Sequence, residues 1–321
     1  MKNRKWLSTI HCILANAWRG FREDKVTKLS GSLAYSTVFS LAPLLVVIIS
    51  ICSVFFGREA IEGKIYLQLS GFLGTDTAAQ LQQIIKNASL DGKGTFSIII
   101  GGAMLLLGST AIFGEIQDSI NGIWGIKAKP KRNWLKMLQN RLLSFSMVIS
   151  LVFLLLVSLM ISSVIESLGN RLRIEFPNTS IVLLYVLNAI VTLVVTTAIF
   201  GVIFKVLPDA DIKWKDVAFG AIATAILFML GKFAISYYIS RASIGSTYGA
   251  AGSVVILLLW VYYSSIILYF GAELTKAYAL QLGAPIHPKS YAVTVGVYEK
   301  EYGKKAISEK RPRKKDAKIL P

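Results

Sequence analysis

The sequence is poor in the residues that build most catalytic centres. Its 321 residues include two cysteines and two histidines, and His11 and His287 lie at opposite ends of the chain. It contains no Walker loop, HExxH pair, GxSxG turn or Cys/His spacing suited to a metal. These absences argue against an enzyme, a metal or cofactor site, and a pump that hydrolyses ATP by itself.

Charged residues are also scarce. They make up 17% of the chain, against about 25% in typical soluble domains. Hydrophobic residues make up 54%, and they gather in six runs of roughly 18 residues or more, enough to cross a bilayer core. Because lipid offers the backbone no hydrogen-bond partners, each run is predicted to be a helix. The predicted fold is an all-α polytopic membrane protein with six transmembrane helices: Leu33–Phe56, Phe96–Gly114, Leu142–Ile165, Ile181–Leu207, Val217–Ile239 and Ser253–Phe270.

Positive charge alternates between the connecting segments. Cytoplasmic segments of membrane proteins are enriched in Lys and Arg. With the N-terminus inside, 27 of the 35 Lys and Arg residues lie in or beside inner segments. We therefore expect a multi-pass protein of the bacterial inner (plasma) membrane with both termini in the cytoplasm. In this orientation most of the positive charge behind the net +17 lies next to the anionic lipids of the inner leaflet, which attract it. We therefore expect membrane lipids rather than nucleic acid as partners.

The chain divides into three predicted regions: a cytoplasmic amphipathic segment at 1–29, a membrane domain at 30–283, and a basic, mostly disordered cytoplasmic tail at 284–321. Apolar residues recur at helical spacing through the first region. This pattern predicts an amphipathic interfacial helix on the inner leaflet. The same pattern also fits a helix packed beneath the bundle as a lid. The residues of this face are Trp6, Leu7, Ile10, Ile13, Leu14, Ala17, Trp18 and Phe21.

Two residues inside the predicted spans could shape a pathway. Lys232 lies within the fifth span, where a charge is costly and often functional. Its ammonium either reaches the outer interface along its own stem or faces a hydrated cavity that attracts an anionic group. Pro43 removes a backbone hydrogen bond in the middle of the first span, and it predicts a kink there.

Three acidic residues close predicted spans on the inner side. Glu115 and Asp118 follow the second span three residues apart, and Glu273 ends the sixth. They either pair with neighbours such as Arg141 and Lys276, or form a cluster that senses protons or cations, since close carboxylates can share protons.

Several longer motifs carry a family resemblance. They are LAYSTVFSLAPLLVVI in the first span, NGIWG after the second, LPDADIKWKDVAFGA between the fourth and fifth, and YGAAGSVVILLLWVYYSSIILYFGAEL in the sixth. Over roughly residues 25–280 the chain resembles the YihY/BrkB family of bacterial inner-membrane proteins. The resemblance implies six membrane helices and a role in the envelope or in lipid or solute transport.

Members of this family have often been labelled ribonuclease BN. A metal-dependent RNA hydrolase needs clustered ligands to generate a hydroxide nucleophile. Two isolated histidines cannot supply such a cluster, so the sequence argues against ribonuclease activity.

Two functions fit these observations. The first is an ATP-independent transporter of a lipid-like or small anionic ligand, with Glu115, Asp118, Lys232 and Glu273 as candidate ligand or gating residues. The alternative is an envelope scaffold protein that transports nothing. A continuous polar cavity between the helices would favour transport, and a tightly packed apolar centre would favour the scaffold. The sequence leaves the oligomeric state open.

Overall fold

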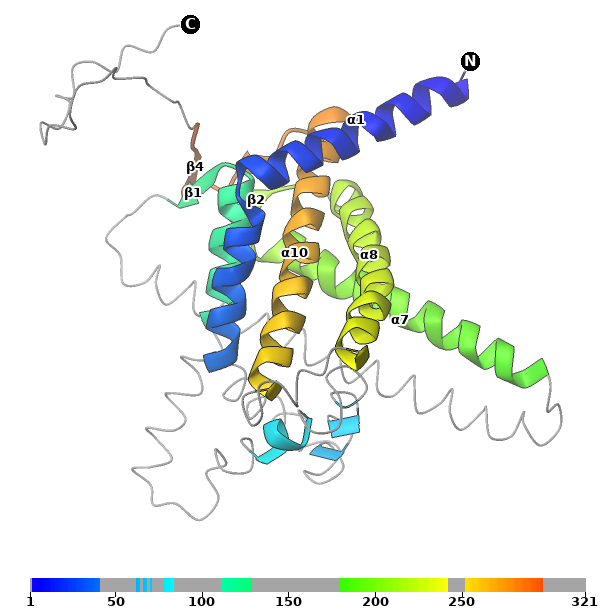
Figure 1. Ribbon diagram of the computed structural model, residues 1–321. Helices are drawn as coiled ribbons and strands as arrows, with labels where there is room; N and C mark the ends of the chain where they lie inside the picture. Colours follow the sequence, from blue (N-terminus) through cyan, green and yellow to red (C-terminus); the bar gives the residue numbers. More distant parts are fainter. Residues whose placement is uncertain are drawn as a thin grey trace, which may run out of the picture.

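A computed structural model of the chain describes residues 2–40, 62–63, 66–67, 70, 78–83, 111–128, 179–241 and 252–296. These residues form a bundle of helices with four short strands at one end (Figure 1). Three helices are both long and apolar: α7 (Thr179–Val206), α8 (Trp214–Arg241) and α10 (Gly252–Gln281).

The three long helices have the length and composition to cross a membrane. Their apolar stretches are Val186–Val206, Trp214–Ile235 and Val254–Gln281, which overlap the last three predicted spans. The first three predicted spans lie wholly or mostly outside the described residues, although 33–40 and 111–114 are helical. Pro43, and with it the predicted kink, also lies outside them.

Reciprocal glycine and threonine pairs hold α8 against α10. Gly220 faces Thr275, and Gly271 faces Thr224, so the two helices run antiparallel in close contact. Each threonine hydroxyl donates to the carbonyl of the glycine four residues earlier, with distances of 2.6 Å for Thr224 and 2.8 Å for Thr275. Small residues four apart allow membrane helices to approach closely, and a threonine that bonds its own helix leaves no polar group unsatisfied.

Helix α1 (Lys2–Glu23) lies across one end of the bundle (Figure 1). It ends in a turn in which Lys25 adopts a left-handed φ of 50°, and a second helix follows at 26–40. Ile13 and Ala17 are buried against the C-terminal part of α10, whereas Leu14 and Trp18 are exposed. The buried face corresponds to the predicted lid, and the location of α1 at a membrane interface remains a prediction.

Two small antiparallel sheets lie at the same end as α1. Strand β1 (Ile126–Ala128) pairs with β4 (Ala292–Thr294), and β2 (Ala210–Asp211) pairs with β3 (His287–Pro288). We call this end of the bundle the strand end. The first part of the predicted tail is thus folded onto the bundle, while 297–321 lies outside the described residues.

Within the described part of the chain, a large hydrophobic cluster lies next to the strand end. The side chains of Val26, Ile120, Phe204, Val217 and Tyr269 are all fully buried there, and they come from five different helical segments. At the strand end, distant segments of the chain are therefore fixed relative to one another.

Candidate functional site

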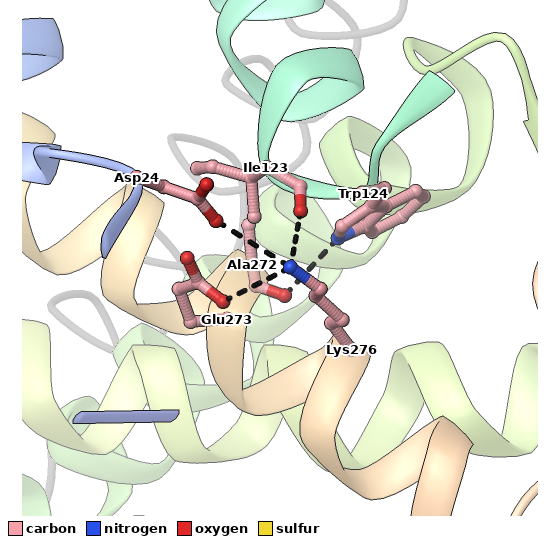
Figure 2. A network of polar contacts seen from close by, with 6 residues as sticks. All are labelled: Asp24, Ile123, Trp124, Ala272, Glu273 and Lys276. Carbon is pink, nitrogen blue, oxygen red and sulfur yellow. Dashed lines mark hydrogen bonds and ion pairs between the residues drawn. The ribbon is translucent and has the colours of Figure 1, made fainter. Parts of the chain in front are cut away.

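Three of the sequence motifs meet at the strand end. NGIWG ends the helix at 111–123, LPDADIKWKD forms the turn from α7 to α8, and FGAEL lies in the last part of α10. The indole nitrogen of Trp124 donates to the carbonyl of Ala272 at 3.1 Å, which ties the first motif to the third (Figure 2). These contacts make the strand end the candidate functional site.

Asp209 is the centre of a buried hydrogen-bond network, with only 3% of its surface exposed. Its carboxylate accepts from Asn121 Nδ2 at 3.0 Å, Gln117 Nε2 at 3.1 Å and the Tyr291 hydroxyl at 3.0 Å. Its own backbone N–H donates to Asn121 Oδ1 at 2.8 Å, and its carbonyl accepts from the Lys289 N–H at 2.9 Å. Asp209 therefore joins the helix at 111–123, the α7–α8 turn and the segment of β3 and β4.

Burial and the charge of Asp209 shift the pKa values of the neighbouring groups. Burial raises the pKa of Tyr291 to about 12, and the negative charge of Asp209 adds to the effect. Burial lowers the pKa of Lys289, although the nearby carboxylates oppose that shift. Partial burial, with the charges of Glu115 and Asp209, raises the pKa of Asp118. Tyr291 thus remains a hydrogen-bond donor to Asp209 at any physiological pH.

Lys205 stabilises the α7–α8 turn. Its ammonium donates to the carbonyl of Ile212 at 2.5 Å, lies 3.5 Å from Asp211 and stands 5.8 Å from the centre of the Trp214 ring. A cation near the C-terminus of α7 also interacts favourably with the helix dipole. These contacts give Lys205 a structural role, and they account for one basic residue of the predicted inner surface.

A second polar centre lies where α10 passes under α1 (Figure 2). The ammonium of Lys276 donates to the carbonyl of Ile123 at 2.5 Å and lies 3.4 Å from Asp24 and 3.8 Å from Glu273 Oε2. Glu273 is 2% exposed, and its Oε1 has no hydrogen-bond partner within the described part of the chain. The centre therefore gathers Lys276, Asp24 and the buried Glu273 where α10 meets the turn after α1.

Glu273 borders a pocket of about 350 Å³ between α1 and α10, which we call the α1–α10 pocket. Arg19, Gly20 and Glu23 of α1 line one side of it, and Glu273, Lys276 and Gln281 of α10 line the other. A Cβ atom at Gly20 would collide with the carboxylate of Glu273. Glycine at this position lets α1 lie directly against the buried acid.

An apolar groove of about 300 Å³, which we call the α1 groove, lies between α1, α8 and α10. Its lining contains no polar or charged residue. The lining residues are Ile10, Ile13, Leu14, Phe219, Ala223, Ile226, Leu227, Phe270 and Leu274. The α1 groove and the α1–α10 pocket are thus lined by different residues of the same two helices, α1 and α10.

The structure brings three of the four predicted ligand or gating residues to the strand end, in two separate clusters. Glu115 accepts a hydrogen bond of 2.6 Å from Ser32, with Asp118 on the same helix beside it. Glu273 is instead paired with Lys276, one of the two partners proposed from the sequence. The other proposed partner, Arg141, lies outside the described residues.

Lys232 lies apart from the acidic residues. Its neighbour Gly231 packs against Tyr263, ten residues before Glu273 on α10, which corresponds to about 15 Å along the helix. The adjacent Leu230 and Phe233 are exposed. Lys232 itself is partly buried, and both interpretations of its role remain predictions.

Sequence reasoning missed several residues of the site. Asp209 could have been found, because a carboxylate within the predominantly apolar junction of two spans needs a partner. Asp24, Arg19 and Gly20 gave no such signal, since their importance depends on how α1 lies across α10.

Comparison with known proteins gives a consistent result. The family described as "Virulence factor BrkB" matches residues 17–292. The chain is 28% identical to a UPF0761 membrane protein of Tolumonas auensis, covering 86% of this chain and 90% of that protein. It is 28% identical to one of Haemophilus influenzae, with 81% and 92% covered, and 25% identical to one of Ralstonia nicotianae, with 84% and 60% covered. No solved structure matches. The relatives' names describe membrane proteins and state no enzymatic activity.

Proposed function

We propose that this chain, which belongs to the BrkB family of membrane proteins, moves a lipid-like amphiphile across or within the membrane without ATP of its own. In this proposal the protein lies in the bacterial inner membrane, and the strand end faces the cytoplasm. The basic residues Arg19, Arg22, Lys213, Lys215 and Lys289 then lie where anionic lipid attracts them.

The observation that carries the proposal is the pairing of two different hollows under α1. The α1 groove is apolar throughout, and the α1–α10 pocket contains both signs of charge. An amphiphile has the same division, with apolar chains and a polar head. A small anionic ligand would use the α1–α10 pocket alone and would leave the α1 groove without a role.

The contact between α1 and the bundle is suited to opening. Among the α1 side chains that the structure describes, Ile13 and Ala17 are the buried ones, and they form a small cluster with Leu274 and Ala277. Phe21 adds a partly buried ring contact with Phe270. A small apolar contact is readily separated, because the stabilisation scales with the buried area. In this account α1 acts as the lid, and Glu273 and Lys276 lie beneath it.

Two specific observations favour the scaffold alternative. The threonine and glycine pairs close the space between α8 and α10, and Asp209 locks the strand end with satisfied hydrogen bonds. If the protein is a scaffold, the hollows under α1 are surface features filled by ordinary membrane lipid.

A transport assay with a matched pair of variants separates these functions. The protein is placed in vesicles carrying a fluorescent phospholipid, and transbilayer movement is followed by chemical quenching from outside. Ala223→Trp fills the α1 groove, whereas Ala218→Trp adds the same side chain to an exposed position of α8 outside it. We expect Ala223→Trp to slow movement and Ala218→Trp to leave it unchanged. Equal rates for the two variants at equal protein abundance would contradict a role for the groove.

A further inference from the structure

We propose that Asp24 and Glu273 share one proton, and that this proton holds α1 closed against α10. Loss of the proton leaves two negative charges beneath the end of α1, and the helix then separates from the bundle. We call this carboxyl pair the α1 latch. The latch concerns the position of α1 alone, so it stands whether or not the protein moves a lipid.

The two carboxyl groups contact each other directly. Asp24 and Glu273 are hydrogen-bonded to each other through their side chains. An ionised carboxylate can only accept hydrogen bonds, so this contact needs a proton on one of the two groups. Without that proton, the buried Oε1 of Glu273 has no donor within the described part of the chain. Carboxyl groups at such close range retain a proton between them, because their like charges disfavour the ionisation of both.

Lys276 supplies a single positive charge to this pair. Its ammonium lies 3.4 Å from Asp24 and 3.8 Å from Glu273, and both carboxyl groups turn toward it (Figure 2). With one shared proton, the pair carries one negative charge, which this ammonium balances. With no proton, a second negative charge remains next to a side chain that is only 2% exposed. A buried charge without a partner is costly, so the contact loses stability when the proton leaves.

Further charged groups near the pair lie on α1. Arg19 and Glu23 both line the α1–α10 pocket, both are exposed, and they carry opposite charges. Cys12 is the remaining titratable residue of that lining, and the helix at 111–123 contributes the uncharged carbonyl of Ile123, which binds Lys276. Exposed charges are screened by solvent, and those of Arg19 and Glu23 offset each other. The protonation state of the buried pair therefore decides the charge beneath α1.

The backbone of α1 lies directly on the carboxyl group of Glu273. A Cβ atom at Gly20 would collide with that group, so glycine lets the helix touch the acid. Gly20 belongs to the last turn of α1, where the negative end of the helix dipole disfavours a nearby carboxylate. Asp24 follows in the turn where Lys25 has a φ of 50°, which joins α1 to the next helix. A charge on Glu273 therefore repels α1 close to the joint about which it can swing.

The direction of the pH dependence follows from the shared proton. At low pH the pair holds its proton and α1 is closed. As pH rises, the proton leaves to solvent through Asp24, whose side chain is 32% exposed, and α1 opens. Loss of a single proton changes the ratio of open to closed molecules by at most about tenfold per pH unit, which corresponds to about 1.4 kcal/mol.

The test measures the distance between α1 and α8 in the full-length protein in detergent. Spin labels are attached through Ala15→Cys and Ala218→Cys, at two exposed positions, after both native cysteines are replaced by serine. Double electron–electron resonance then gives the distance distribution from about pH 5 to about pH 9, a range in which an ordinary isolated carboxyl group does not titrate. We expect one short distance at the low end and a growing population of longer distances as pH rises.

Two amide variants imitate the shared proton. Asp24→Asn and Glu273→Gln each place an N–H donor between the two groups that no change of pH removes. We expect both variants to keep the short distance over the whole range. Asp211→Asn is the control, because Asp211 is an exposed acid at the same end of the bundle that pairs with Lys205. It should show the same pH dependence as the wild-type protein.

The wild-type comparison is decisive by itself and needs no variant that might fail to fold. A distance distribution that stays the same over the whole pH range would overturn the latch. Opening as pH falls would contradict its direction. Opening with rising pH that survives in both Asp24→Asn and Glu273→Gln would assign the control of α1 to another group, and it would equally overturn the proposal.

Discussion

The packing of α8 on α10 makes a quantitative prediction at Gly220. A Cβ atom added there would lie 2.9 Å from Thr275 Cβ and 3.2 Å from Thr275 Cα. Neither of those atoms can rotate away, so the helices must separate. Overpacking of this kind costs about 1–3 kcal/mol, while alanine recovers about 0.5–1 kcal/mol of helix preference. We therefore expect Gly220→Ala to lower the free energy of unfolding by about 1–2 kcal/mol, which lowers Tm by a few degrees.

The assay is thermal unfolding in detergent, with Gly31→Ala as the control. Gly31 also lies in a helix, but a Cβ atom there would meet no other described atom within 4 Å. Gly31→Ala should leave Tm unchanged or raise it slightly. Thr275→Ala removes Oγ1, the atom nearest the new Cβ, but keeps Cβ and Cα, so Gly220→Ala should cost somewhat less in that background without becoming neutral, as a double-mutant cycle would show. A Tm for Gly220→Ala equal to or above that of Gly31→Ala would refute the close packing.

Four further predictions follow from other parts of the structure. Asp209→Asn places an amide among three donors and should destabilise the protein by about 1–3 kcal/mol in the same thermal assay, whereas Asp211→Asn, at an exposed position, should have little effect. The pKa of Asp118 is raised in the folded protein, so folding favours its protonated form and the charged form that dominates at higher pH destabilises the protein. Asparagine mimics the protonated form, so Asp118→Asn should raise Tm near pH 7, and the gain should vanish near pH 4, where Asp118 itself becomes protonated. Lys232→Met should retain lipid movement at normal membrane abundance; a loss of movement would instead place Lys232 on the ligand path. Reporters active only outside the membrane should remain inactive when fused at residue 1 or 321, and activity at either terminus would overturn the cytoplasmic orientation.

The long apolar helices could be predicted from composition because a membrane span is a local property. The stretches at Val186–Val206, Trp214–Ile235 and Val254–Gln281 each satisfy their backbone hydrogen bonds internally, so their length and apolar character are enough to identify them. The sheets could not be predicted in this way. Strand β2 has two residues, and its partner β3 lies more than seventy residues further on, so neither leaves a period in the sequence.

One residue of the candidate site could be predicted because its signal is also local in the sequence. Glu273 was visible because an acid at the end of an apolar run stands out locally. Its surroundings were not, because Asp24 and Gly20 reach it only through the turn at Lys25 and the crossing of α1 over α10. Asp209 shows the intermediate case: its cost in an apolar context was visible in the sequence, but its partners Gln117 and Tyr291 depend on the fold.

The central claim, that the protein moves an amphiphile by itself, is tested most directly with purified wild-type protein in vesicles that contain no nucleotide. The measurement is the rate at which a fluorescent phosphatidylethanolamine crosses the bilayer, compared with protein-free vesicles and with vesicles holding an unrelated membrane protein at the same density. The account predicts a faster rate that increases with the amount of protein and falls in Ala223→Trp. A rate equal to that of both control vesicles, with folded protein present in the membrane, would contradict transport and leave the scaffold as the better account.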